Sequence, residues 1–320
     1  MKILVIFTGG TIGTSTKDGW TDIDNNTKYV LLDSYNNKDE IEFVPSSPYS
    51  TLSENLSANH LNLLQKEIGE NLTKGFDGII VTHGTDTLQY TAAAIEYAFN
   101  GCEMPIVFVS ADYPLEDSRT NGFINFEAAV EFVKSKSANG VFVSYKNNDE
   151  DITNIHIASR ILQHGEYDAN IYSIDNVPFA TYSDKITKNN IEIENTNNIG
   201  IVNYVESPCI LSVESYPGNN YAYCLDNVNA VILKPYHSGT LDTANRCLMD
   251  FCKLANEKNV PVFVTGTHYG VAYKSTELYG ELGVKLVPYG TYIAAYMKIW
   301  AGISLSQNIE DFVNTRIANE

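Results

Sequence analysis

The chain has 320 residues, 44% of them hydrophobic and 19% charged, which is ordinary for a globular protein and long enough for two domains. Asp and Glu number 39 against 21 Lys and Arg, and this net charge of −18 excludes nucleic-acid binding through clustered basic residues. No apolar run reaches the roughly 18 residues of a membrane span, and glycines follow the first strand too soon for a secretory leader. We therefore expect a cytoplasmic protein with no membrane partner.

Short apolar runs alternate with amphipathic stretches through the first half of the chain. Consecutive apolar residues that end in Gly or polar turns predict buried strands, and the stretches between them predict helices. The predicted strands are residues 2–7, 78–82, 105–110 and 140–145, and the predicted helices are 57–72, 87–100 and 125–136. Repeated strand–helix–strand units build a parallel sheet with helices on both faces.

A polar, Asn-rich stretch at residues 183–198 is the predicted linker, after which the alternation resumes. It separates a domain at 1–182 from a second domain at 199–320. The second domain has predicted strands at 199–205, 230–236 and 261–266 and a predicted helix at 241–258. The sequence thus predicts two α/β domains, a larger N-terminal one with a parallel sheet and a smaller C-terminal one.

The first predicted strand runs directly into the turn TGGTIG. Gly9 and Gly10 allow positive φ angles or a close backbone approach, and Thr11 then follows at the end of the strand. The turn alone fits either a glycine-rich connection with an incidental threonine or a functional hydroxyl, because short glycine motifs recur widely.

A second strand, GIIVT, ends in the turn HGTDT. Thr85 and Asp86 therefore lie at the same kind of strand end as the first threonine, although Thr87 can also serve as a helix N-cap. Ligands of parallel sheets bind at the carboxyl ends of the strands. A hydroxyl beside a carboxylate and near a second hydroxyl suits acyl transfer, because a threonine nucleophile must lose its proton to a neighbouring base.

TGGTIG and HGTDT together resemble the bacterial-type L-asparaginase family, and the chain is most similar to its cytoplasmic type I branch. Further similar segments are SENLS at 53–57, YPLEDSRTNGFINFEAAV at 113–130, YPG at 216–218 and YHSGT at 236–240. The resemblance implies hydrolysis of L-asparagine to L-aspartate and ammonia in asparagine catabolism. It also implies a homodimer or homotetramer and no metal or organic cofactor.

The resemblance also implies roles for individual residues of the N-terminal, catalytic domain. Thr11 would be the nucleophile that forms a β-aspartyl ester, while Thr85 and Asp86 would activate it or water and bind the substrate amine. The remaining substrate-binding positions would be Ser53 and Glu54, which hold the α-carboxylate and α-amino groups, and the backbones of Gly10 and Gly84, which face the oxyanion.

The chain departs from the family at two positions near the two threonines, and also at Thr240, where the family commonly has an asparagine contributed across a subunit boundary. The family has a lysine three residues after an arginine, whereas Gln163 follows Arg160 here. Glutamine forms hydrogen bonds but carries no charge and transfers no proton, so Lys146, at the end of the 140–145 strand, is the candidate substitute. Trp20 stands near the lid tyrosine of the family, and its indole can close a lid by packing but cannot accept a proton.

Two alternatives to asparagine hydrolysis stay open because of Gln163. The chain can be a catalytically impaired homologue that binds an amino acid, or an amidase for another small amide. Glutamine as a second substrate also stays open, because one methylene is worth only about 1–3 kcal/mol of discrimination.

Overall fold

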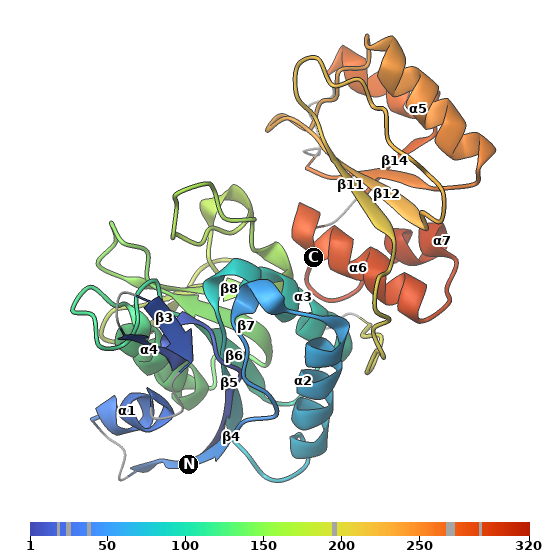
Figure 1. Cartoon of the computed structure of the whole chain (residues 1–320). Coiled ribbons are helices and arrows are strands. Elements are labelled where there is room, and N and C mark those ends of the chain that lie inside the picture. The colour runs from blue at the N-terminus through green and yellow to red at the C-terminus, as the bar shows by residue number, and fades with distance from the viewer. Residues whose placement is uncertain (18–19, 24–26, 37–39, 194–196, 267–272, 288–289) are drawn as a thin grey trace. The chain divides into compact units, whose positions relative to one another are not determined.

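The computed structural model describes the chain except residues 18–19, 24–26, 37–39, 194–196, 267–272 and 288–289, and it describes only the backbone of the remaining residues between 14 and 28. The described residues form two compact units (Figure 1). The first comprises Met1–Val202 with Ile317–Asn319, and the second comprises Asn203–Arg316 with Glu320. Within the part of the chain that is described, no helix is both long and apolar enough to cross a bilayer.

The first unit is built on an eight-stranded sheet with the strand order β10-β9-β8-β7-β6-β5-β1-β4. Strands β4, β1, β5, β6 and β7 are parallel, and β8, β9 and β10 continue the sheet with antiparallel pairings. The strands are β1 (Lys2–Phe7), β4 (Glu42–Ser46), β5 (Gly78–Thr82), β6 (Pro105–Val109), β7 (Gly140–Tyr145), β8 (Thr153–Ile157), β9 (Ala180–Tyr182) and β10 (Ile186–Lys188). Because parallel strands end at the same edge, β1, β5, β6 and β7 present their carboxyl ends together.

Helices cover both faces of this sheet (Figure 1). The sheet has a hydrophobic core on each face, and alternate residues of β1 belong to different cores. Ile3 and Val5 pack with residues of α4, and Leu4 and Ile6 pack with residues of α2 and α3. This double burial explains why the strands are apolar at consecutive positions. The helices are α1 (Thr27–Ser34), α2 (Ala58–Asn71), α3 (Leu88–Phe99) and α4 (Gly122–Ser135), and a two-stranded antiparallel sheet joins β2 (Thr14–Lys17) to β3 (Trp20–Ile23).

The second unit is also an α/β structure. Its four strands are parallel in the order β11-β12-β13-β14, and helices α5 and α6 pack on separate cores: Val231 belongs to the core of α5 and Ile232 to that of α6. The elements are β11 (Ile210–Glu214), β12 (Ala230–Lys234), β13 (Val262–Val264), β14 (Val284–Leu286), α5 (Arg246–Glu257), α6 (Tyr292–Ser304) and α7 (Ile309–Asn314). The predicted α/β class is confirmed.

The structure differs from the sequence-based expectations between the two units. The segment 183–198, predicted as a linker, contains strand β10 and belongs to the first unit, which continues to Val202. The prediction of a strand at 199–205 is wrong, because these residues form neither helix nor strand. The Gln65 amide accepts from the Val202 N–H at 2.9 Å and donates to its carbonyl at 3.0 Å, so a side chain satisfies the backbone that a strand partner would otherwise pair.

Candidate functional site

The turns after β1 and β5 touch through two glycines. Gly10 has φ +75°, and a Cβ atom built on it would lie 2.2 Å from both Cα and N of Gly84. No L side chain fits at that separation, so glycine is required for both the backbone angle and the contact. The contact brings together two short 3-10 helices, η1 (Thr11–Gly13) and η4 (Thr85–Thr87). Thr11 and Thr85 therefore begin neighbouring turns, and both are half-buried.

A third loop, which follows β4, clamps the first turn from the other side. The Gly10 N–H donates to the Thr51 carbonyl at 3.0 Å, and the Thr51 N–H donates to the Thr8 carbonyl at 3.0 Å. Gly9 has φ +99°, and a Cβ there would lie 2.3 Å from the same Thr51 oxygen. The Gly10 N–H is thus occupied by Thr51, and an oxyanion could recruit it only at the cost of that bond.

The same loop carries η3 (Ser53–Asn55), which supplies Ser53 to the site. The buried Ser53 hydroxyl donates to Oδ2 of Asp86 at 3.3 Å, and Thr87 donates to the Ser53 carbonyl at 2.8 Å. A Cβ on Gly84 would lie 2.5 Å from Ser53 Oγ. The structure therefore brings Gly10, Gly84, Ser53 and Asp86 together, and Glu54 lies on η3 beside them, exposed like Asp86.

A layer of buried polar groups supports these turns from below. The Thr8 hydroxyl donates to the Thr82 carbonyl at 2.6 Å, and Ser110 donates to the His83 carbonyl at 2.7 Å. His83 is fully buried, and its Nδ1 lies 2.8 Å from the Gly84 carbonyl, an acceptor, so Nδ1 carries the proton. Burial lowers the pKa of His83 to about 4. A neutral, buried imidazole that donates to the Gly84 carbonyl is a structural part of this turn.

A cavity of about 450 Å³ opens beside Thr85 and Asp86. Gln163 lines it, so the residue that replaces the expected lysine does lie at the Thr–Asp pair. The full lining is Thr85, Asp86, Gln89, Gln163, His164, Gly165, Tyr167, Asp168 and Ala169.

One wall of this cavity is a loop that is held by hydrogen bonds from residues at the end of β7. Tyr145 donates its hydroxyl to the Ala169 carbonyl at 2.8 Å. The Asn147 amide donates to the Ile171 carbonyl at 3.1 Å and accepts from the Ile171 N–H at 2.9 Å. Side chains at the end of one strand thus hold a loop that begins after β8.

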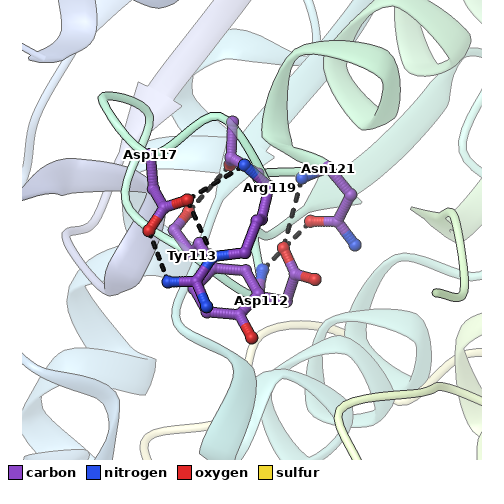
Figure 2. A network of polar contacts seen from close by, with 6 residues as sticks. Asp112, Tyr113, Asp117, Arg119 and Asn121 are labelled. Atoms are coloured by element: carbon purple, nitrogen blue, oxygen red, sulfur yellow. Dashed lines mark hydrogen bonds and ion pairs between the residues drawn. The ribbon is translucent and has the colours of Figure 1, made fainter.

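The turn after β6 is fixed by its own polar network (Figure 2). Asp112 and Asn121 bond reciprocally, each side chain accepting from the other's backbone N–H at 3.2 Å and 3.0 Å. Arg119 binds both oxygens of Asp117, which lowers the pKa of that carboxyl to about 2, and its guanidinium lies 4.0 Å from the Tyr113 ring centre (Figure 2). The network orders this strand end without lining the cavity.

Lys146 lies at the end of β7, where Asn125 and Asn121 bind its backbone N–H and carbonyl at 2.7 Å and 2.8 Å. Strand β6 lies between β7 and β5. The backbone of Lys146 is therefore two strand spacings, about 10 Å, from the β5 backbone. Lys146 is not among the described residues that line the cavity. For Trp20 the backbone is described as part of β3, but its side chain lies outside the described atoms, and its assignment to a lid stays a prediction.

The sequence analysis missed Thr51, Gln89 and His164, and also the cavity residues Gly165, Tyr167, Asp168 and Ala169. Thr51 follows β4, a strand that contains Pro45 and is half-exposed, so it lacks the continuous apolar signal of its neighbours. Gln89 lies in a largely apolar helix pattern that also contains Thr91 and Glu96, so nothing in the sequence singles it out. His164 has no partner histidine at metal-ligand spacing, and only the folded loop brings it to the cavity.

Comparison with known proteins identifies relatives for the first unit. The family model described as "Asparaginase, N-terminal" matches residues 2–198. A glutamyl-tRNA(Gln) amidotransferase component from Methanosarcina acetivorans is 31% identical over 188 residues, which are 56% of this chain and 43% of that protein. The Pyrobaculum aerophilum protein of the same name is 30% identical over 132 residues, 41% of this chain and 32% of that protein. This chain thus spans less than half the length of either relative.

Solved structures match the fold of the whole chain. The thermostable L-asparaginase from Thermococcus kodakarensis superimposes with a TM-score of 0.81 at 20% identity, over 100% of this chain and 99% of that one. L-asparaginase I from Vibrio cholerae gives 0.81 at 22% identity, over 100% and 98%. A probable cytoplasmic L-asparaginase from Campylobacter jejuni gives 0.79 at 20% identity, over 98% of each chain. At these identities the likeness establishes the fold.

We expect Gly10→Ala to destabilise the protein far more than Gly75→Ala. Both glycines have nearly the same φ, +75° and +76°, but a Cβ on Gly75 meets nothing within 4 Å. Gly75→Ala should cost roughly 1 kcal/mol for the backbone angle alone, and Gly10→Ala about 3 kcal/mol or more, because the clash with Gly84 adds to it. Urea unfolding measures both, and equal losses would contradict the contact.

We expect His83 to make the protein less stable as the pH falls from 6.5 to 4. In this range the unfolded histidine takes up a proton that the buried one refuses, because its pKa is lowered to about 4. The free energy of unfolding should fall by about 3 kcal/mol more in the wild type than in His83→Asn, which keeps an N–H donor and does not titrate. Urea titrations across this range test it, and parallel pH profiles would refute it.

Proposed function

Because the chain belongs to the asparaginase family, we propose that it hydrolyses L-asparagine to L-aspartate and ammonia with Thr11 as the nucleophile. The observation that supports this proposal is the contact of Gly10 with Gly84, which places the Thr11 and Thr85 turns side by side. Acyl transfer needs two such hydroxyls and a carboxylate within one site, and Asp86 supplies the carboxylate.

In the proposed reaction, the Thr11 oxygen attacks the side-chain amide carbon and its proton passes to the departing nitrogen. Ammonia leaves, and a β-aspartyl ester remains on the threonine. Water activated at Thr85 and Asp86 then cleaves the ester and returns the proton to Thr11. Since the Gly10 N–H binds Thr51, we assign the oxyanion to the backbone of the Gly84–Thr85 turn, and we assign Gly10 the role of admitting the close approach.

Substrate recognition is proposed for the side chains around these turns. Ser53 and Glu54 would bind the α-carboxylate and the α-amino group, and Asp86 would share the amino group. The bond from Ser53 to Asp86 supports this arrangement because it fixes both side chains before substrate arrives. We place the activity in the cytoplasm, and we expect the protein to act as a homodimer or homotetramer, as the resemblance implies.

A second candidate is amide hydrolysis as part of an amidotransferase. The sequence relatives named as components of glutamyl-tRNA(Gln) amidotransferases favour it. The net charge of −18 gives this chain no basic surplus for direct tRNA contact. Ammonia release by the isolated chain, measured with asparagine and with glutamine in parallel, separates the two candidates: release from asparagine alone supports the first.

The third candidate is an impaired homologue that binds an amino acid without hydrolysing it. It is favoured by Gln163, which lines the cavity at Thr85 and Asp86 and carries no charge. Saturable binding of asparagine by calorimetry without any ammonia release would select this candidate over the others.

We expect Thr11→Val and Thr85→Val each to lower asparagine turnover by at least about 10³-fold, because each removes a reacting hydroxyl with little change in volume. Thr153→Val is the matched control: this threonine is buried in β8, and its hydroxyl has no partner among the described residues. It should leave ammonia release unchanged. Near-normal release by either site variant would remove that threonine from the mechanism.

We expect Gln163→Lys to raise turnover if the wild type is slow, because the new ammonium favours ionised groups at the Thr–Asp pair. At contact distance and an effective dielectric near 20, this attraction is about 4 kcal/mol before desolvation. If the wild type is already fast, Lys146→Met tests the substitute lysine and should cripple the enzyme. Fast wild-type turnover together with a fully active Lys146→Met variant would refute the need for any lysine.

A further inference from the structure

The cavity beside Asp86 contains two carboxylates and two further acceptor atoms that no described residue pairs. Two carboxylates, Asp86 and Asp168, lie on its walls. None of the described residues that line it is a lysine or an arginine, and the chain as a whole carries a net charge of −18. Two carboxylates on one cavity repel each other, and a positive charge bound between them would relieve that repulsion.

Gln89 gives an independent sign of a missing donor. This side chain is only 3% exposed, and its Nε2 donates to the Asp86 carbonyl at 3.3 Å. Its Oε1 atom is buried and has no hydrogen-bond partner in the described part of the chain. A buried carbonyl oxygen without a donor is costly, and Gln89 lines the cavity, so we read the unpaired oxygen as a sign of a ligand that donates to it.

His164, from the loop that follows β8, repeats the pattern in the same cavity. Its Nδ1 lies 3.0 Å from the Asn170 carbonyl, which can only accept, so Nδ1 carries the proton and Nε2 of the neutral ring is an acceptor. That Nε2 is also buried, and no described residue donates to it. An imidazole nitrogen needs an N–H or O–H donor, or a nitrogen-binding metal, and is a poor ligand for alkali cations.

We propose that this cavity binds a free ammonium ion. Ammonium combines a positive charge, which the two carboxylates favour, with four N–H donors, enough for Gln89 Oε1 and His164 Nε2 as well. An alkali cation would supply the charge without the donors. Binding itself is independent of the proposed hydrolysis, although that reaction would produce the ligand next to this cavity. A bound ammonium ion would also place a positive charge where Gln163 provides none.

Thermal unfolding without substrate tests the proposal, with chloride salts of ammonium, potassium and tetramethylammonium compared at equal concentration. At about 100 mM we expect ammonium to raise the Tm by about 2 °C over tetramethylammonium, which has no N–H, and over potassium. An equal rise with potassium would overturn the ammonium assignment, and equal Tm values in all three salts would overturn the site.

Substitutions in the cavity test whether the ammonium-specific rise in Tm arises there. Asp168→Asn removes one carboxylate but keeps an acceptor for the Asn170 N–H, and Gln89→Met removes the unpaired oxygen at similar size; each should at least halve the ammonium-specific shift. Gln163→Lys should abolish it, because a tethered ammonium fills the cavity. The matched control is Glu70→Gln, which removes one charge from the exposed face of α2 and should keep the full shift. A shift that survives in all three cavity variants would overturn the proposal.

The two proposals fail separately. Asparagine hydrolysis without an ammonium-specific shift supports the proposed function and refutes the ammonium site. An ammonium-specific shift in a protein that hydrolyses no amide supports the site and refutes the proposed function.

Discussion

The approach of two backbones at Gly10 and Gly84 is the constraint on which the candidate site depends. The turns rise from β1 and β5, adjacent parallel strands that are about 4.8 Å apart, and they close that distance only because neither glycine carries a Cβ. Thr11 and Thr85 each follow the touching residue directly in the chain, so their positions derive from the contact. The backbone thus sets the positions of the two threonines, and the orientation of their side chains affects only where the hydroxyls point.

Bonds that cross from one strand end to the next keep the arrangement rigid. Thr51 holds the first turn from β4, Thr8 reaches the end of β5, and Ser110 reaches back from β6 to His83. Thr8, Ser110 and His83 are buried and paired, and His83 stays neutral because burial lowers its pKa to about 4. A charged group in this layer would need its own counter-ion, so neutral donors suit a support that lies beneath carboxylates.

The sequence predicted the central strands and the turn residues because both have strong local signals. Runs such as the one that forms β5 are apolar at every position, and Gly10 and Thr11 follow a strand directly. The parts that it missed depend on long-range pairing. Strand β10 and the irregular segment at Val202 owe their structure to β9 and to the Gln65 amide, which lies 137 residues away in sequence. The positions of Gln89 and His164 at one cavity likewise depend on how a loop folds over a distant strand end.

The amide of Asn147 and the hydroxyl of Tyr145 attach the cavity loop to the end of β7 by hydrogen bonds. These bonds join side chains to a neighbouring backbone, so the wall shares no strand pairing with the turns that carry the two threonines. Residues between Gln163 and Ala169 can therefore change in identity or number, provided that the attachment at Ala169 and Ile171 survives, while the glycine contact stays as it is. The turns joined by the glycines and the wall of the cavity are therefore separate parts of this chain, and natural selection can alter one while it keeps the other.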